Sequence, residues 1–133
     1  MRKTLIPFLV FIFYSVSAFT QDSLAKPNGN VDTEYVAFFP GGISAWNKYL
    51  VDNIDFNIPT KNKAKKGKYR ILIQFVVSKD GIVTDLKAET NFGYGMEEEA
   101  IRVLKNSPKW NPAFQHGRFV NYYQRQPITF LVE

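Results

Sequence analysis

Few residues in this sequence could carry out chemistry. The single histidine is His116, in a Gln-His-Gly segment, and the sequence contains no second histidine and no cysteine. Zinc ribbons, thiolate nucleophiles and disulfide bonds all require cysteine or several histidines, so the composition excludes these classes of site. We therefore interpret His116 as a surface residue of a turn, and we predict no metal site.

Three consecutive glutamates, Glu97 to Glu99, could in another setting act as general acids or bases. Consecutive residues point in different directions around a helix, so these carboxylates do not converge on one substrate. They occupy the first turn of a predicted helix, where the helix dipole favours negative charge, and Glu98 is placed for an i,i+4 pair with Arg102. No nucleophile motif such as Gly-x-Ser-x-Gly is present. These patterns predict a protein that is not an enzyme and uses no cofactor.

Lysines are crowded into one short segment. Its members are Lys61, Lys63, Lys65, Lys66 and Lys68. Such a cluster can bind an anionic surface, such as lipopolysaccharide or an acidic protein face, or it can simply be a solvated loop, which is the interpretation we favour. The formal net charge of +5 is modest, whereas nucleic-acid binding usually requires a strongly basic face. We therefore predict no nucleic-acid partner.

The first 20 residues have the order of a secretory signal peptide. Arg2 and Lys3 precede an almost entirely apolar run, and small residues follow at positions 17 and 18. The apolar stretch 5–19 has 15 residues, fewer than the roughly 20 that span a bilayer. We expect export to the periplasm, cleavage after Thr20 or Ala18, and no stable membrane span after cleavage. The alternative is an uncleaved anchor in the inner membrane with the domain facing the periplasm.

Residues 21–34 are polar and contain a Pro-Asn-Gly-Asn cluster, which is typical of a flexible linker. Residues 35–133 then form the predicted domain. Its first helix follows the breaker segment 39–42, because apolar residues recur at helical spacing from Trp46 to Ile54. A second helix begins near Met96 and ends before Pro108.

Three strands are predicted. Segment 71–77 is apolar on both faces, which favours a central strand. A tight turn at 79–81 leads to a returning strand, 82–89, with Ile82, Thr84, Leu86 and Ala88 on one face. The last strand runs from about residue 121 to 132. It contains Pro127, and because proline cannot donate to a ladder, this strand is predicted to be an outer one with free backbone groups.

Five short segments in this order resemble the C-terminal domain of TonB, in a variant that opens with Phe-Pro-Gly-Gly, over roughly residues 35–133. They are Phe39-Pro40-Gly41-Gly42, Gln74–Val77 with Lys79-Asp80-Gly81, Glu98–Ala100 with Leu104, Pro108–Pro112, and Pro127–Phe130. The resemblance implies an α+β fold in which two helices pack on a three-stranded antiparallel sheet. It also implies a protein-binding module in outer-membrane transport, which holds a transporter segment as an added strand beside its last strand.

The resemblance and the open edge together indicate which residues would contact a partner. From the last strand these are Asn121, Tyr123, Arg125, Thr129 and Leu131, and from the positions matching the family's Tyr-Pro segment they are Asn57, Ile58 and Pro59. We expect an outer-membrane transporter or another periplasmic protein segment as the partner, with a homodimer through the same strand as an alternative.

Energy-transducing members of the family have a retained membrane helix and a long proline-rich spacer, and neither is expected here. The sequence therefore predicts a stand-alone docking domain, with no mechanical link to the inner membrane once the leader is removed. The alternatives are a short, membrane-anchored energy transducer, if the leader is retained, and a binder of anionic envelope surfaces through the lysine-rich loop.

Overall fold

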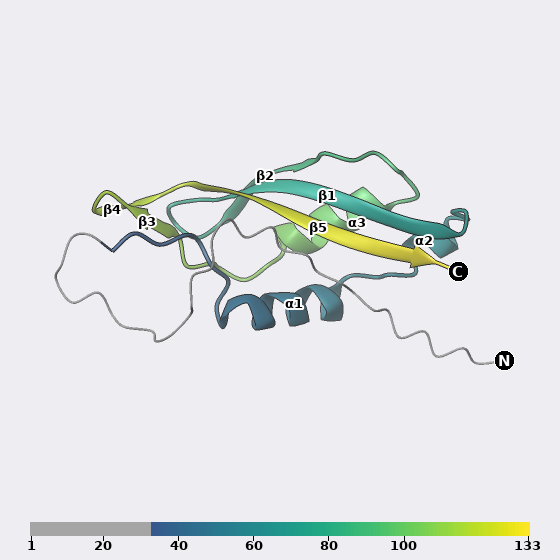
Figure 1. Cartoon of the computed structure of the whole chain (residues 1–133), viewed down its shortest axis with the longest axis horizontal. Helices are drawn as coiled ribbons and strands as arrows, with labels where there is room; N and C mark the ends of the chain where they lie inside the picture. The colour runs from purple at the N-terminus through teal and green to yellow at the C-terminus, as the bar shows by residue number, and fades with distance from the viewer. Residues whose placement is uncertain (1–32) are drawn as a thin grey trace.

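The computed structural model describes residues 33–133. The predicted signal peptide, 1–20, and the linker as far as residue 32 therefore lie outside the described residues. The elements follow the order α1 (Gly42–Asn53), α2 (Ile58–Lys61), β1 (Gly67–Val77), β2 (Val83–Ala88), α3 (Met96–Lys105), β3 (Ala113–Gln115), β4 (Arg118–Val120) and β5 (Tyr122–Val132), as shown in Figure 1.

The principal sheet has three antiparallel strands in the order β2-β1-β5. Strand β1 is central, as its two apolar faces predicted. It pairs with β5 in unbroken register from Gly67 opposite Val132 to Val77 opposite Tyr122. The two long strands run side by side, and the β3–β4 hairpin lies beyond one end of β1 (Figure 1). The fold is therefore α+β with a three-stranded antiparallel sheet, as expected.

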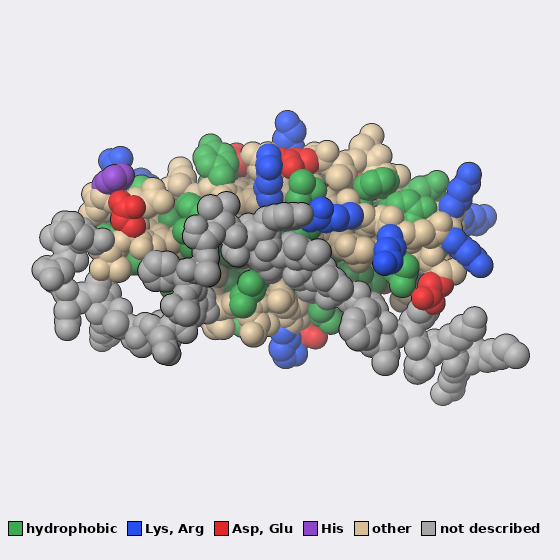
Figure 2. Space-filling model, viewed as in Figure 1, with side chains coloured by type: hydrophobic (Ala, Val, Ile, Leu, Met, Phe, Trp, Pro, Cys, Tyr) green, Lys and Arg blue, Asp and Glu red, His purple; other side chains and the backbone are tan. Residues whose placement is uncertain are grey.

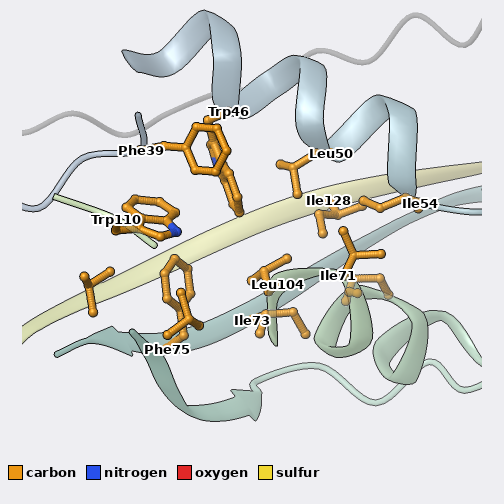
Figure 3. Close-up of a cluster of buried hydrophobic side chains, with 14 of the residues drawn as sticks. Phe39, Trp46, Leu50, Ile54, Ile71, Ile73, Phe75, Leu104, Trp110 and Ile128 are labelled. Atoms are coloured by element: carbon orange, nitrogen blue, oxygen red, sulfur yellow. The ribbon is translucent and has the colours of Figure 1, made fainter. Parts of the chain in front are cut away.

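Helices α1 and α3 contribute to one hydrophobic core with one face of this sheet. Ile71, Ile73 and Phe75 of β1 are buried there together with Ile128 and Phe130 of β5. Figure 3 shows Leu50 of α1 and Leu104 of α3 directed at the strand residues Ile71, Ile73 and Ile128. Because both helices share that face, the β5 side chains on the other face are exposed or half-buried.

Two features were not predicted from the sequence. One is the one-turn helix α2, and the other is a hairpin of two three-residue strands, β3 and β4. Single backbone bridges tie the segment before α1 to this region, joining Tyr35 to Phe114 and Phe38 to Asn111. Elements of three or four residues cover barely one period of a helical or strand pattern, and a periodic signal needs several repeats, so periodicity does not reveal them.

The predicted facing of β2 was wrong at its start. Ile82 is 57% exposed and its neighbour Val83 is buried, the reverse of the expected alternation. The cause is an irregularity in the β1–β2 ladder between Gln74 and Val76, beside Asp85, whose φ is +52°. An extra residue in one strand reverses the faces of the residues on either side of it.

The predicted Glu98–Arg102 pair was also wrong. Arg102 instead pairs with Glu99, with 2.9 Å between Nε and Oε1, and its Nη2 donates to the Asn53 carbonyl at the end of α1. Glu97 accepts hydrogen bonds from the backbone amides of Phe92 and Gly93, at 2.5 and 3.2 Å. Two of the three glutamates therefore hold neighbouring segments in place.

Tyr49 links α1 to α3, because its hydroxyl donates a 2.8 Å hydrogen bond to the Val103 carbonyl. Burial raises the pKa of this phenol above its ordinary value of 10.0, and the nearby Arg102 guanidinium offsets part of the rise. The unfolded chain therefore loses this proton at a lower pH than the folded one. The stability associated with Tyr49 is complete below pH 10 and is lost as the pH rises toward the folded pKa.

We therefore expect the free energy of unfolding to fall above pH 10 and to fall less steeply in Tyr49→Phe, which has no phenolic proton at this position. Urea unfolding between pH 8 and 11 measures both slopes. Tyr123→Phe is the matched control, because Tyr123 is exposed. Identical slopes for the wild type and Tyr49→Phe would contradict the expectation.

Candidate functional site: the outer edge of strand β5

Backbone groups of β5 that point away from β1 can be identified from the ladder itself. The Glu89 amide donates to the Leu72 carbonyl at 2.8 Å, and the Leu72 amide donates to Thr90 Oγ1 at 3.2 Å. Leu72 therefore directs its backbone toward the β2 side of the sheet. Successive residues of a strand alternate, so Ile71 and Ile73 direct theirs toward β5.

The alternation fixes the orientation of β5. Ile71 pairs with Ile128 and Ile73 pairs with Gln126, so these two β5 residues bond to β1. The residues between them and beyond them direct their amides and carbonyls at the open side. These edge residues are Tyr123, Arg125, Pro127, Thr129 and Leu131. Within residues 33–133, no further strand pairs with this side of β5.

Pro127 lies at the middle of this open edge. It pairs with Leu72, whose backbone faces β2, so the backbone of residue 127 faces away from β1. The β1–β5 ladder therefore loses no hydrogen bond because proline lacks an amide N–H. Its carbonyl already accepts a 2.8 Å hydrogen bond from Gln126 Nε2, while Gln126 Oε1 accepts one from Trp46 Nε1, also at 2.8 Å. The free edge is consequently divided into two stretches, one on either side of Pro127.

Side chains of the edge residues lie on the face of the sheet opposite the helices. Tyr123 is 71% exposed and Leu131 is 40% exposed, and Arg125 forms a 3.0 Å ion pair with Glu89. Thr129 is half-buried opposite Arg70. Asn121 precedes the strand, and its Oδ1 accepts a 2.9 Å hydrogen bond from the Lys79 amide, which fastens the start of β5 to the β1–β2 turn.

The second predicted contact group lies in and beside α2. Asn57 is exposed and Ile58 is half-buried, whereas Pro59 is fully buried. Pro59 does not fit the predicted role of a partner contact, because its ring is already covered by the domain. The short helix packs against α3 and β5, and Phe56 beside it contacts Phe130 at 5.5 Å between ring centroids.

The other outer strand is a poorer template. Strand β2 has six residues and contains the irregularity at Asp85, whereas β5 offers 11 residues in continuous register. Bulges and short length are common protections of exposed strand edges. Of the two outer edges, only that of β5 combines length with regularity.

The remaining predicted positions lie elsewhere. His116 occupies the β3–β4 turn, is strongly exposed, and has Nδ1 3.5 Å from Glu34 Oε1. Trp110 is buried in the core, as expected. Within the described part of the chain, no group of three or more acidic or histidine side chains is arranged to hold a metal ion.

The five clustered lysines extend from the last residue of α2, Lys61, to the second residue of β1, Lys68. Lys61 is paired with Asp55 at 2.6 Å, and this hydrogen bond is the main reason that the pKa of Asp55 is lowered. Lys63, Lys65, Lys66 and Lys68 are exposed and form no ion pair with any residue from 33 to 133.

These features define a small α+β domain with helices on one face of a three-stranded sheet and one long open edge. The chain belongs to the family described as the Gram-negative bacterial TonB protein C-terminal domain, whose model matches residues 59–132. The match begins in α2 and ends at the last residue of β5. No curated protein sequence matches the chain significantly.

Family membership has direct consequences for function. TonB C-terminal domains are non-enzymatic, periplasmic or envelope-associated domains linked to transport, and they interact with outer-membrane transporters. No helix within residues 33–133 has the length and apolar character needed to cross a membrane.

Proposed function

We propose that this protein is a periplasmic docking module that binds an extended segment of an outer-membrane transporter as a fourth strand beside β5. One observation carries the proposal: β5 is an 11-residue outer strand whose alternate backbone groups face away from β1. Added strands gain affinity from main-chain hydrogen bonds and specificity from neighbouring side chains.

The division of the edge at Pro127 limits what the partner can gain. Tyr123 and Arg125 offer backbone donors and acceptors on one side of the proline, and Thr129 and Leu131 offer them on the other. With roughly 1 kcal/mol net per hydrogen bond, set against association costs of several kcal/mol, we expect a dissociation constant on the order of micromolar.

Amide hydrogen exchange tests the proposal residue by residue. In the free protein, the edge amides of Tyr123, Arg125, Thr129 and Leu131 are expected to exchange faster than those of Gln124 and the other β1-paired positions. Adding a peptide from the periplasmic N-terminal segment of a transporter should protect the edge amides selectively. Protection that rises with protein concentration alone would indicate a homodimer through β5 instead.

Thr129→Pro provides the matched mutational test. It removes one edge amide and adds a ring on the open side, but it leaves the β1–β5 ladder intact because Thr129 does not bond to β1. We expect peptide binding to weaken at least about tenfold, since a lost hydrogen bond and a steric block act together.

Thr129→Val keeps the amide at the same position and should bind nearly as well as the wild type, as measured by isothermal titration calorimetry. If a transporter peptide bound both variants equally, or if the edge amides remained unprotected in the complex, strand addition at β5 would be wrong.

A further inference from the structure

The lysine segment is joined to a group of aromatic side chains that are distant in the sequence. Tyr69 on β1 contacts Phe92 and Tyr94 in the loop before α3, with ring centroids 5.6 and 6.4 Å apart. Phe92 is 47% exposed and Tyr94 is 41% exposed, so both rings remain accessible from solvent although they contact Tyr69.

Two hydrogen bonds hold the aromatic group against the lysines. The Tyr69 hydroxyl donates to the Lys65 carbonyl at 2.6 Å, and Asn62 Nδ2 donates to the Tyr94 carbonyl at 2.8 Å. The aromatic rings and the lysine segment are therefore one structural unit. We call it the basic aromatic end, and it consists of Lys63, Lys65, Lys66, Lys68, Tyr69, Phe92 and Tyr94.

The charge of this unit is predominantly positive. Two acidic residues lie near this end of the domain. Asp55 is paired with Lys61, and Glu133 follows Val132, which pairs with Gly67 at the start of β1. Arg70, which follows Tyr69 in β1, is a further exposed cation, on the opposite face of the sheet from the Tyr69 ring. Figure 2 shows Lys and Arg side chains gathered at the end of the molecule where α2 and the C-terminus lie, with apolar side chains beside them.

We propose that the basic aromatic end binds the surface of a bilayer that contains anionic phospholipid. The four lysines suit the phosphate groups of the lipid, because juxtamembrane basic residues are attracted to a negatively charged leaflet. Phe92 and Tyr94 suit the interfacial layer, where aromatic rings lose water while polar atoms stay hydrated. The juxtaposition of rings and lysines distinguishes this surface from a solvated charged loop.

Such binding would be independent of strand addition, and it would have a consequence for orientation. The C-terminal half of β5 leads into the same end of the domain, because Val132 and Leu131 pair with Gly67 and Lys68. A domain bound to a lipid surface through this end would therefore hold its open edge close to that surface.

Vesicle co-sedimentation with the full chain tests the proposal. We expect weak sedimentation with phosphatidylcholine vesicles and strong sedimentation when a third of the lipid is phosphatidylglycerol. Lys63→Gln with Lys66→Gln should weaken binding about 25-fold, roughly fivefold for each lysine. Phe92→Ser with Tyr94→Asn should weaken it about tenfold, and asparagine accepts the positive φ of position 94.

Lys105→Gln with Lys109→Gln is the matched control, because it removes two exposed lysines outside the basic aromatic end. All variants share residues 1–32, so any contribution of that segment to sedimentation is common to them. Circular dichroism melting confirms that each variant remains folded.

Three results would overturn the proposal. Equal losses in the two lysine pairs would mean that only overall charge matters. Full binding by the aromatic variant would mean that the rings do not enter the interface. Equally tight binding to poly-glutamate, or displacement by inorganic phosphate beyond that by sodium chloride of equal ionic strength, would indicate an acidic protein or a free anion as the ligand.

Discussion

Gly81→Ala is expected to lower the free energy of unfolding by about 3 kcal/mol, because the change adds both backbone strain and a collision. Gly81 has φ of +83°, a region that side chains rarely adopt, and a Cβ there would overlap the Trp110 carbonyl oxygen and lie 3.1 Å from Lys109 Cγ. The Trp110 amide also donates a 2.8 Å hydrogen bond to the Gly81 carbonyl. The β1–β2 turn therefore has no room to move away.

For a domain of this size, the loss corresponds to a fall in Tm of roughly 15 °C. Gly93→Ala is the matched control. Gly93 has φ of +80°, but a Cβ there would meet nothing within 4 Å, so only the backbone strain of about 1 kcal/mol applies. If both variants melted at the same temperature, close packing of the turn against Trp110 would not be the cause.

Trp46→Ala is expected to destabilise the domain by about 4 kcal/mol, as for other fully buried tryptophans. The Trp46 ring contacts Trp110 at 4.8 Å, Phe39 at 5.1 Å and Tyr49 at 5.6 Å between centroids. Its Nε1 also donates to Gln126, which is buried in β5. The substitution would leave a cavity and an unsatisfied amide oxygen on Gln126, beside the middle of the open edge of β5.

Trp46→Phe separates these two effects. It keeps an aromatic ring but removes the donor, so we expect a smaller cost of about 2 kcal/mol, most of it from the buried Gln126 oxygen that loses its partner. Combining Trp46→Phe with Gln126→Met removes both polar groups and should recover part of the loss. Additive costs in this double-mutant cycle, measured by urea unfolding, would contradict an energetic link between the two side chains.

Much of the fold could be predicted from local patterns. The two longer helices follow apolar residues at helical spacing, and β1 follows an apolar run that only a central strand can bury on both faces. Pro127 marked β5 as an outer strand because a missing amide is tolerated only at an open edge. The structure agrees with that reasoning, since Pro127 directs its backbone away from β1.

Other features depend on contacts that the sequence does not display. The irregularity at Asp85, which exposes Ile82 and buries Val83, arises from how β2 meets β1. Pro59 was expected to contact a partner, but its ring is buried where α2 packs against α3 and β5. Arg102 selects Glu99 rather than Glu98 in a geometry that also lets its guanidinium reach the Asn53 carbonyl on α1.

Taken by itself, the sequence determined the longer helices and strands, the central and outer positions in the main sheet, and the family, because these follow from periodicity, proline and short motifs within single segments. Only the tertiary structure decided which edge amides are free and that Gln126 donates a hydrogen bond to the Pro127 carbonyl. It also decided that aromatic rings lie against the lysine segment. These features join residues as far apart as Trp46 and Gln126, and their geometry is settled only when distant elements pack together.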